Sequence, residues 1–269
     1  MFFENPRKYG SPPYNIVLVH GGPGAAGEMA PVAVVLAQSY GVCEPMQTAF
    51  NIKGQVEELK NLIKLHTSVP IILIGFSWGA WLTFIFTATY PYLVKKLILI
   101  SSGPFENKYA KSIIKTRFSR FDNDEQVKLD ELFWRLGNRN RKNKNKIFEQ
   151  IGELVSKADA YKKINTPKEL IHYQYNIYEA VWKEADELRK KGKLLKLGKQ
   201  IHCPVVAIHG DYDPHPSDGV QKPLSKTLKN FTFALLKNCG HKPWYEAEAR
   251  ENFFRILNKE IKNEKRKGK

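Results

Sequence analysis

The chain has 269 residues, of which 43 are Lys or Arg and 27 are Asp or Glu, so its formal net charge is +16. This length allows one large domain or a core with an insertion, and a hydrophobic fraction of 42% favours a globular protein over a disordered one. The cysteines Cys43, Cys203 and Cys239 lack metal-ligand spacing, and the N-terminal sequence has no apolar signal segment. We therefore expect reduced thiols, core packing for Cys43 and Cys203, a cytoplasmic location, and no metal or cofactor.

A net charge of +16 is a common feature of proteins that bind nucleic acid or anionic surfaces. The densest basic run, Asn138 to Lys146, has no aromatic residue among its charges and matches no recognised binding motif. The lysine-rich tail from Asn258 has the character of a frayed helix end. We interpret both segments as solvated and expect no nucleic-acid partner.

Six segments have the apolar, β-branched pattern of buried strands. They are residues 14–20, 41–48, 69–75, 94–102, 204–210 and 231–237. Helical patterns separate most of them, and another closes the chain at residues 244–261. Strands that alternate with helices predict an α/β fold with a doubly wound, mostly parallel sheet.

An uncharged run between Lys64 and Lys95 is long enough to cross a bilayer as a helix. Its first part, VPIILIG, is short and bounded by proline and glycine, which indicates a buried strand. Its second part, residues 78–91, has the length of a helix and stops at Tyr90-Pro91. We therefore expect a strand, a sharp turn at Ser77 and a helix, and no membrane span.

One long interval, residues 106–199, contains only helical patterns and polar loops. We expect it to form a helical lid inserted between the fourth and fifth core strands, with residues 1–105 and 200–269 forming the core. Tyr175, Tyr178 and Trp182 fall on one helical face of this interval. That face either packs onto the core or lines a substrate pocket.

Four distinctive motifs follow predicted strands. They are HGGPG from His20, GFSWG from Gly75, HGDYDPHP from His209 and NCGHKPW from Asn238. In open α/β sheets the functional groups gather beyond the carboxyl ends of the strands. A nucleophile, an acid and a histidine are therefore expected at one edge of the sheet, beside a glycine-rich loop.

These motifs and their order resemble the α/β-hydrolase family, and HGGPG with GFSWG resembles its prolyl-aminopeptidase-like branch. The resemblance covers residues 14–105 and 201–257. It implies a nucleophile elbow at Ser77, the acid at Asp213, and oxyanion donors at the N–H groups of Gly22 and Trp78. The neighbouring Gly21 and Pro23 would then border the substrate.

The chemistry of these residue types agrees with the resemblance. A serine hydroxyl needs a base to become a good nucleophile, and His241, in a loop after a strand, is the best candidate for that base. A carboxylate must orient the imidazole. Three other carboxylates stay open as alternatives to Asp213, namely Asp211, Asp218 and Glu106, whereas His20, His209 and His215 are interpreted as structural or peripheral.

The chain departs from the family at two points. Only thirteen residues precede Tyr14, too few for the usual two-strand hairpin, so we expect a trimmed sheet of about six strands. Glutamates of the lid bind the amino group of the substrate in prolyl aminopeptidases. Glu169, Glu179, Glu184 and Glu187 do not match that pattern.

The sequence therefore predicts a serine hydrolase that cleaves a small ester or amide through an acyl-enzyme intermediate. One alternative is a prolyl-aminopeptidase-like exopeptidase acting on short peptides. Two others are a non-catalytic binder on the same scaffold and a binder of anionic surfaces. The oligomeric state stays open.

Overall fold

The computed structural model describes residues 4–138, 142–166 and 170–263, and its centre is a seven-stranded sheet of order β1-β4-β2-β5-β6-β8-β9. Six of these strands are parallel and coincide with the predicted segments. They are β2 (Tyr14–Val19), β4 (Gly41–Glu44), β5 (Ile71–Phe76), β6 (Val94–Ile100), β8 (Val205–Gly210) and β9 (Phe231–Leu236). The predicted α/β fold with a mostly parallel sheet is confirmed.

The expectation of six strands omitted β1 (Arg7–Tyr9), which pairs antiparallel with β4 at the sheet edge. Its three residues, RKY, carry no apolar alternation that could reveal a strand. Backbone pairing with β4 holds it, and side-chain hydrogen bonds add to that pairing. The Tyr9 hydroxyl donates to Glu44 Oε2 at 2.8 Å, and the amide of Asn5 makes two bonds with the backbone of Met46.

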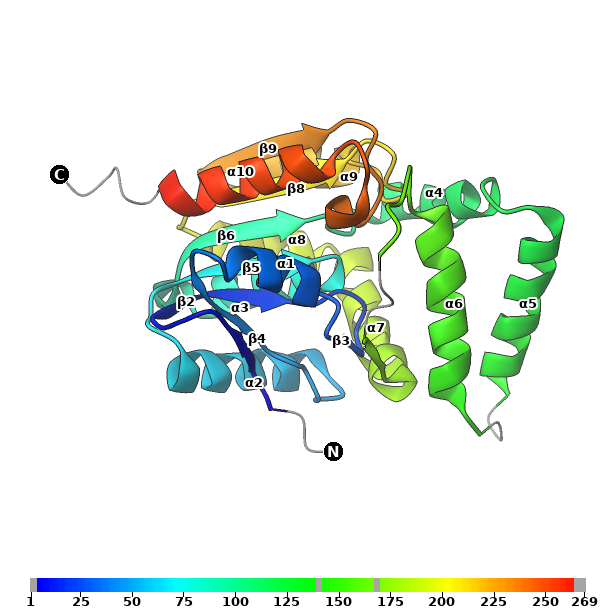
Figure 1. Cartoon of the computed structure of the whole chain (residues 1–269), viewed down its shortest axis with the longest axis horizontal. Helices are drawn as coiled ribbons and strands as arrows, with labels where there is room; N and C mark the ends of the chain where they lie inside the picture. Colours follow the sequence, from blue (N-terminus) through cyan, green and yellow to red (C-terminus); the bar gives the residue numbers. More distant parts are fainter. Residues whose placement is uncertain (1–3, 139–141, 167–169, 264–269) are drawn as a thin grey trace.

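Alternate residues along each central strand enter two different cores because side chains alternate across a sheet. Ile16 and Leu18 of β2 pack with helices α1 (Ala30–Leu36) and α10 (Arg250–Lys262) on one face. Val17 and Val19 pack on the other face. That face is covered by α2 (Ile52–His66), α3 (Trp78–Thr89) and α9 (Asp218–Thr227). Figure 1 shows this layered arrangement.

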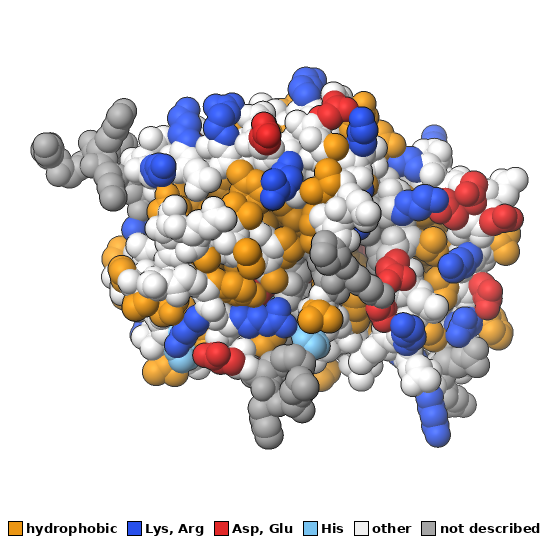
Figure 2. All heavy atoms as spheres, in the orientation of Figure 1, with side chains coloured by type: hydrophobic (Ala, Val, Ile, Leu, Met, Phe, Trp, Pro, Cys, Tyr) orange, Lys and Arg blue, Asp and Glu red, His pale blue; other side chains and the backbone are white. Residues whose placement is uncertain are grey.

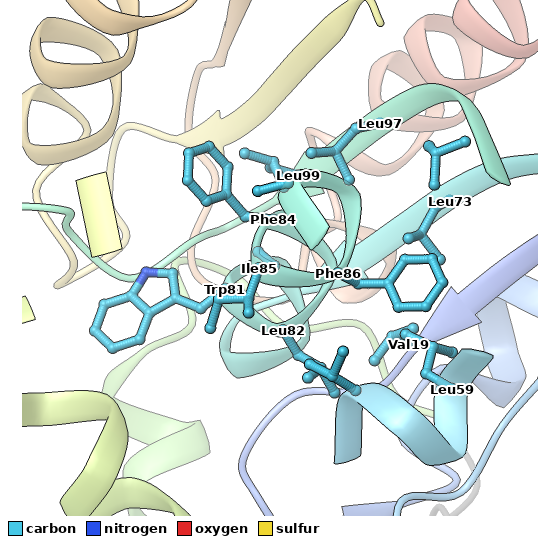
Figure 3. Packing of buried hydrophobic residues seen from close by; sticks show 14 of the residues in the cluster. Val19, Leu59, Leu73, Trp81, Leu82, Phe84, Ile85, Phe86, Leu97 and Leu99 are labelled. Atoms are coloured by element: carbon cyan, nitrogen blue, oxygen red, sulfur yellow. The ribbon is translucent and has the colours of Figure 1, made fainter. Parts of the chain in front are cut away.

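The uncharged run folds into β5 and α3, and both are buried. All six residues of β5 are buried. Helix α3 places Phe84 and Phe86 near Leu99 and Leu73 of the strands, while the ring of Trp81 points away from them (Figure 3). An all-apolar helix is expected where every side faces protein, which explains why this run resembles a membrane span. Within the described residues, no helix combines the length and the apolar character that crossing a membrane requires.

The chain between β6 and β8 is mainly helical and is called the inserted helical segment below. Its described elements are α4 (Asn107–Phe118), α5 (Asn123–Gly137), α6 (Lys144–Ala158), the short strand β7 (His172–Tyr173), α7 (Tyr175–Lys190), α8 (Lys193–Lys196) and the 3-10 helix η2 (Leu197–Gln200). Helices α5 and α6 form a separate small apolar core with Phe121 and with Tyr175 of α7. Ile177, Val181 and Ala185 of α7 join the main core that contains α3. Figure 1 shows α4, α5 and α6 beyond the carboxyl ends of the strands.

Two other expectations concern cysteines and charge. Cys43 is buried in β4, and Cys203 is partly buried against the main core. On the face drawn in Figure 2, Lys and Arg side chains are spread among acidic and uncharged ones. Residues 139–141 of the basic run and 264–269 of the tail lie outside the described part of the chain.

Helix α2 offers a matched test of core packing. The side chain of Leu59 is fully buried against the sheet, while Leu65 on the same helix is 77% exposed. We expect Leu59→Ala to lower the free energy of unfolding by about 2–5 kcal/mol, because it removes buried contacts and leaves a cavity. Leu65→Ala should change it by less than about 0.5 kcal/mol. Urea denaturation followed by circular dichroism measures both, and equal losses would contradict the burial of this face.

Candidate active site

Ser77 lies in a strained turn between β5 and α3. Its φ of 52° and ψ of −112° are unusual for a residue with a side chain, and its N–H donates to Ile100 O of β6 at 2.9 Å. The turn is tight enough that a Cβ at Gly75 would lie 2.2 Å from Gly79 O. A Cβ at Gly79 would lie 2.4 Å from His20 O. Only glycine fits at either position, as the sequence motif predicts.

His241, in the loop between β9 and the 3-10 helix η3 (Pro243–Tyr245), joins Ser77 to Asp213. The Ser77 hydroxyl donates to His241 Nε2 at 3.0 Å, and His241 Nδ1–H donates to Asp213 Oδ2 at 2.7 Å. Both side chains of the His241–Asp213 pair are almost completely buried. The structure thus brings together three residues that lie far apart in the sequence, after β5, β8 and β9.

The charge of Asp213 is stabilised although the group is buried. Burial alone would raise the pKa of its carboxyl group, but His241, His215 and His209 together hold that pKa well below its usual range. Burial alone would lower the pKa of His241, but the facing carboxylate of Asp213 raises it. The site therefore favours an ionised acid beside a histidine of increased basicity.

The three alternative acids have other partners. Asp211 accepts from the backbone N–H of Cys239 at 3.3 Å and lies 3.6 Å from Lys237. Asp218 pairs with Lys222, and Glu106 pairs with Lys108. Among these four candidates, Asp213 is the one bonded to His241.

The sequence favours a structural or peripheral role for His215, and the structure places it in direct contact with Asp213. Its backbone N–H and its ring Nδ1 both lie within 2.9 Å of Asp213 Oδ1. Its ring stacks on His241 with centroids 4.6 Å apart. The sequence signal was the two-residue spacing in DYDPHP, which places a second imidazole beside the acid.

His20 and His209, the other two histidines interpreted as structural or peripheral, are fully buried. His20 supports the glycine-rich loop. Its Nδ1–H donates to Gly21 O at 2.8 Å, and its Nε2 accepts from Gln47 N–H at 3.5 Å. Gly22 has a φ of 31°, and its carbonyl accepts from Ala25 N–H, closing a turn around Pro23. The loop then continues into β3 (Ala25–Ala26), which pairs with β7 of the inserted segment.

The end of helix α6 holds the two loops that carry the acid and the histidine. The carbonyl of Asp159 accepts from the backbone N–H of His241 at 2.9 Å. Arg120 donates to Ala158 O and to Tyr212 O, and its guanidinium lies 3.6 Å from the centre of the Tyr212 ring. The geometry of the candidate site therefore depends on the inserted helical segment as well as on the sheet.

The predicted aromatic face of α7 forms a stack that reaches α3. Tyr178 stacks on Trp182 with centroids 6.2 Å apart, and Trp182 stacks on Trp81 at 5.7 Å. Tyr175 is buried and donates its hydroxyl to Glu179. Tyr178 and Trp182 are only partly buried, so each keeps some exposed ring surface. Much of this face serves packing.

A separate cleft of about 550 Å³ lies beside the β3–β7 ladder. Its walls come from the N-terminal region, from α6 and from the residues around β7. The lining residues are Asn5, Ala26, Met46, Thr48, Asn145, Lys146, Glu149, Ile171, His172, Tyr173 and Gln174. None of the predicted site residues is among them.

One cluster has the composition of a metal site. The ligand atoms of Asp213, His215 and His241 lie within 4.8 Å of one another. The same atoms are already bonded to each other as donors and acceptors, at 2.7 and 2.8 Å. Hydrogen bonding is therefore sufficient to account for their arrangement.

Comparison with known proteins concerns mainly the fold. A family model described as the alpha/beta hydrolase fold matches residues 14–248. No curated protein gives a significant match. Among solved structures, a putative lipase from Acinetobacter baumannii is similar at 19% identity and a TM-score of 0.64, over 95% of this chain and 87% of that one.

Two further solved structures have the same fold. An esterase from Thermogutta terrifontis is similar at 16% identity and a TM-score of 0.62, over 96% of this chain and 92% of that one. A bromoperoxidase from Bacillus anthracis is similar at 14% identity and a TM-score of 0.64, over 96% of this chain and 94% of that one. Similarity at these identities concerns the fold, and the different activities in these names leave the reaction to be argued from the site.

Proposed function

The chain belongs to the alpha/beta hydrolase family, and from this premise we propose that it is a serine hydrolase that cleaves a small ester or amide through an acyl-enzyme intermediate. The observation that carries the proposal is the continuous chain of hydrogen bonds from Ser77 Oγ through His241 to Asp213. A hydroxyl, an imidazole and a buried carboxylate in this order constitute the machinery of nucleophilic acyl transfer.

In the first half of the reaction, Ser77 Oγ attacks the carbonyl carbon of the substrate while its proton passes to His241 Nε2. The resulting imidazolium lies 2.7 Å from the Asp213 carboxylate, which stabilises its charge. The N–H groups of Gly22 and Trp78 are the proposed donors to the oxyanion. Trp78 is the first residue of α3, so the positive end of the helix dipole adds to this stabilisation.

Collapse of the tetrahedral intermediate breaks the bond to the leaving group, which takes the proton from His241. In the second half, His241 removes a proton from water, and the hydroxide attacks the acyl carbon bound to Ser77. The proton then returns to Ser77 Oγ as the acid product leaves, so the enzyme is regenerated without a cofactor.

The prolyl-aminopeptidase-like alternative requires acidic groups that bind a free amino group. Glu179 accepts from the Tyr175 hydroxyl, Glu184 accepts from the backbone N–H of Ile52, and Glu187 pairs with Lys191. All three lie at exposed positions, and Glu169 is outside the described residues. These contacts favour a simple ester or amide over an aminoacyl substrate.

A substrate panel distinguishes the two proposals. We expect measurable kcat/KM for p-nitrophenyl esters of short acyl chains and little cleavage of amino-acid anilides, including proline anilide. Tyr178 and Trp182 are the proposed pocket residues, so Trp182→Ala should change KM across acyl chain lengths more than kcat on the shortest ester. Proline anilide cleaved as efficiently as the best ester would instead establish the exopeptidase.

The nucleophile can be tested by covalent labelling. A fluorophosphonate probe should modify Ser77, and Ser77→Ala should abolish labelling and lower kcat by about 10⁶-fold, because no other group forms the acyl-enzyme. Mass spectrometry of the labelled peptide identifies the site. Ser225→Ala, at an exposed position of α9, is the control and should label like the unmodified protein. Full labelling of Ser77→Ala would exclude Ser77 as the nucleophile. If the folded wild-type protein were not labelled at all, the alternative of a non-catalytic binding protein would be favoured.

The acid can be tested by isosteric substitution. Asp213→Asn should lower kcat by about 10⁴-fold, because the amide leaves His241 in the wrong tautomer without changing the shape of the site. Asp211→Asn and Glu106→Gln should have much smaller effects, since their carboxylates pair with Lys237 and Lys108. Steady-state kinetics on the best ester measures all three. If Glu106→Gln were inactive and Asp213→Asn active, the catalytic acid would instead be Glu106, after β6.

A further inference from the structure

Asp213 is hydrogen-bonded to two imidazoles through different carboxylate oxygens, and a third imidazole, that of His209, lies 3.5 Å from Oδ2. His241 Nδ1–H donates to Oδ2 at 2.7 Å. Oδ1 accepts two hydrogen bonds from His215, one from the backbone N–H at 2.9 Å and one from ring Nδ1–H at 2.8 Å. A triad needs only one imidazole on its acid, so the second requires a separate explanation.

His215 is itself held in place from two sides. His209 Nε2–H donates to the carbonyl oxygen of His215 at 2.7 Å, which ties the loop after β8 back to that strand. The ring of His215 stacks on the ring of His241 with an interplanar angle of 29°. Its side chain is only 12% exposed, so water has little access to the shared carboxylate.

The two bonds from His215 fix the orientation of the carboxylate. An aspartate side chain can rotate about its last bond and exchange its two oxygens. Rotation here would break both bonds to Oδ1, one of them from a backbone group that cannot follow. Neutral donors also spread the negative charge of a carboxylate, which weakens its attraction for the proton on His241.

We propose that His215 is a positioning residue that fixes Asp213 with one oxygen directed at His241 and reduces the negative charge that His241 faces. The consequence for catalysis rests on the proposed hydrolase function. The hydrogen-bonded arrangement itself does not depend on it.

The charge state of His215 agrees with this role. Burial lowers its pKa to about 4, although Asp213 acts in the opposite direction. His215 is therefore a neutral donor at neutral pH. His209 also faces the pair, but burial lowers its pKa, so it adds no charge at neutral pH. The charged groups near the two rings are Arg117 of α4 and Asp159 at the end of α6, and these two form a bidentate pair with bonds of 2.8 and 2.6 Å. Their charges largely compensate one another, which leaves Asp213 as the main charge facing His241.

The test removes the ring donor while keeping an aromatic ring. In His215→Phe the stacking surface remains but the bond from Nδ1 is lost. The free His241 must be neutral to act as base, so kcat/KM rises with pH through its pKa. With one donor fewer, the carboxylate attracts the His241 proton more strongly, which raises the pKa of His241. We therefore expect the acid limb of the profile, the pH range in which kcat/KM rises, to move to higher pH by about 0.5 to 1 unit.

Two matched variants separate this effect from a general disturbance. His215→Asn places an amide N–H near the position of Nδ1, so we expect it to return the acid limb toward the wild-type position. His202→Phe makes the same substitution at an exposed histidine and should leave the profile unchanged. A His215→Phe profile that superimposes on the wild-type profile, or a His215→Asn profile as shifted as that of His215→Phe, would overturn the proposal.

A readout that needs no turnover separates the inference from the proposed function. Nitrogen-15 NMR of the histidine rings should show His215 as the neutral Nδ1–H tautomer from pH 5 to 9, and the titration of His241 should shift upward in His215→Phe. The titration can shift in a protein that no fluorophosphonate labels, in which case the hydrolase proposal fails and the role of His215 stands. A His215 that becomes a cation within this range would exclude it as a neutral donor.

Discussion

The close contact between the turn after β5 and the end of β2 determines how the rest of the site is built. A Cβ at Gly79 would lie 2.4 Å from the carbonyl oxygens of both Val19 and His20, so the backbone of α3 meets the glycine-rich loop with no side chain between them. Ser77, two residues before Gly79, is therefore placed directly beside the end of β2. The loops after β9 and β8 then bring His241 and Asp213 to Ser77 through hydrogen bonds of 3.0 and 2.7 Å.

The inserted helical segment contributes to the site through one backbone carbonyl and one arginine side chain. Asp159 O accepts from the N–H of His241, and Arg120 holds the carbonyl of Tyr212, one residue before Asp213. A helix end therefore connects the loop of the acid to the loop of the histidine. Changes in the inserted segment would reach the chemistry by moving these two loops, in addition to any effect on a substrate pocket.

Burial and charge are balanced within a small volume. A fully buried carboxylate is costly unless it is paired and hydrogen-bonded, and Asp213 is surrounded by three imidazoles and one backbone N–H. The burial that makes Asp213 costly also strengthens its interaction with His241, because few water molecules screen it. The proposed role of His215 is to keep this interaction directional while limiting its strength.

The sequence alone determined six strands, the elbow at Ser77 and the order of the residues that meet at the sheet edge, because local hydrophobic patterns and glycine-rich turns encode these features. It did not reveal β1, which has no apolar pattern and is held by backbone pairing with β4 and by the hydrogen bond from Tyr9 to Glu44. It also left the partners of the acids and histidines open. Glu184 accepts a hydrogen bond from the N–H of Ile52, which is 132 positions away in the sequence. His215 is hydrogen-bonded to Asp213, two residues before it. Such choices depend on which loops are brought together across the sheet. A pattern within one segment carries no information about the group that faces it from another, so only the tertiary structure decided them.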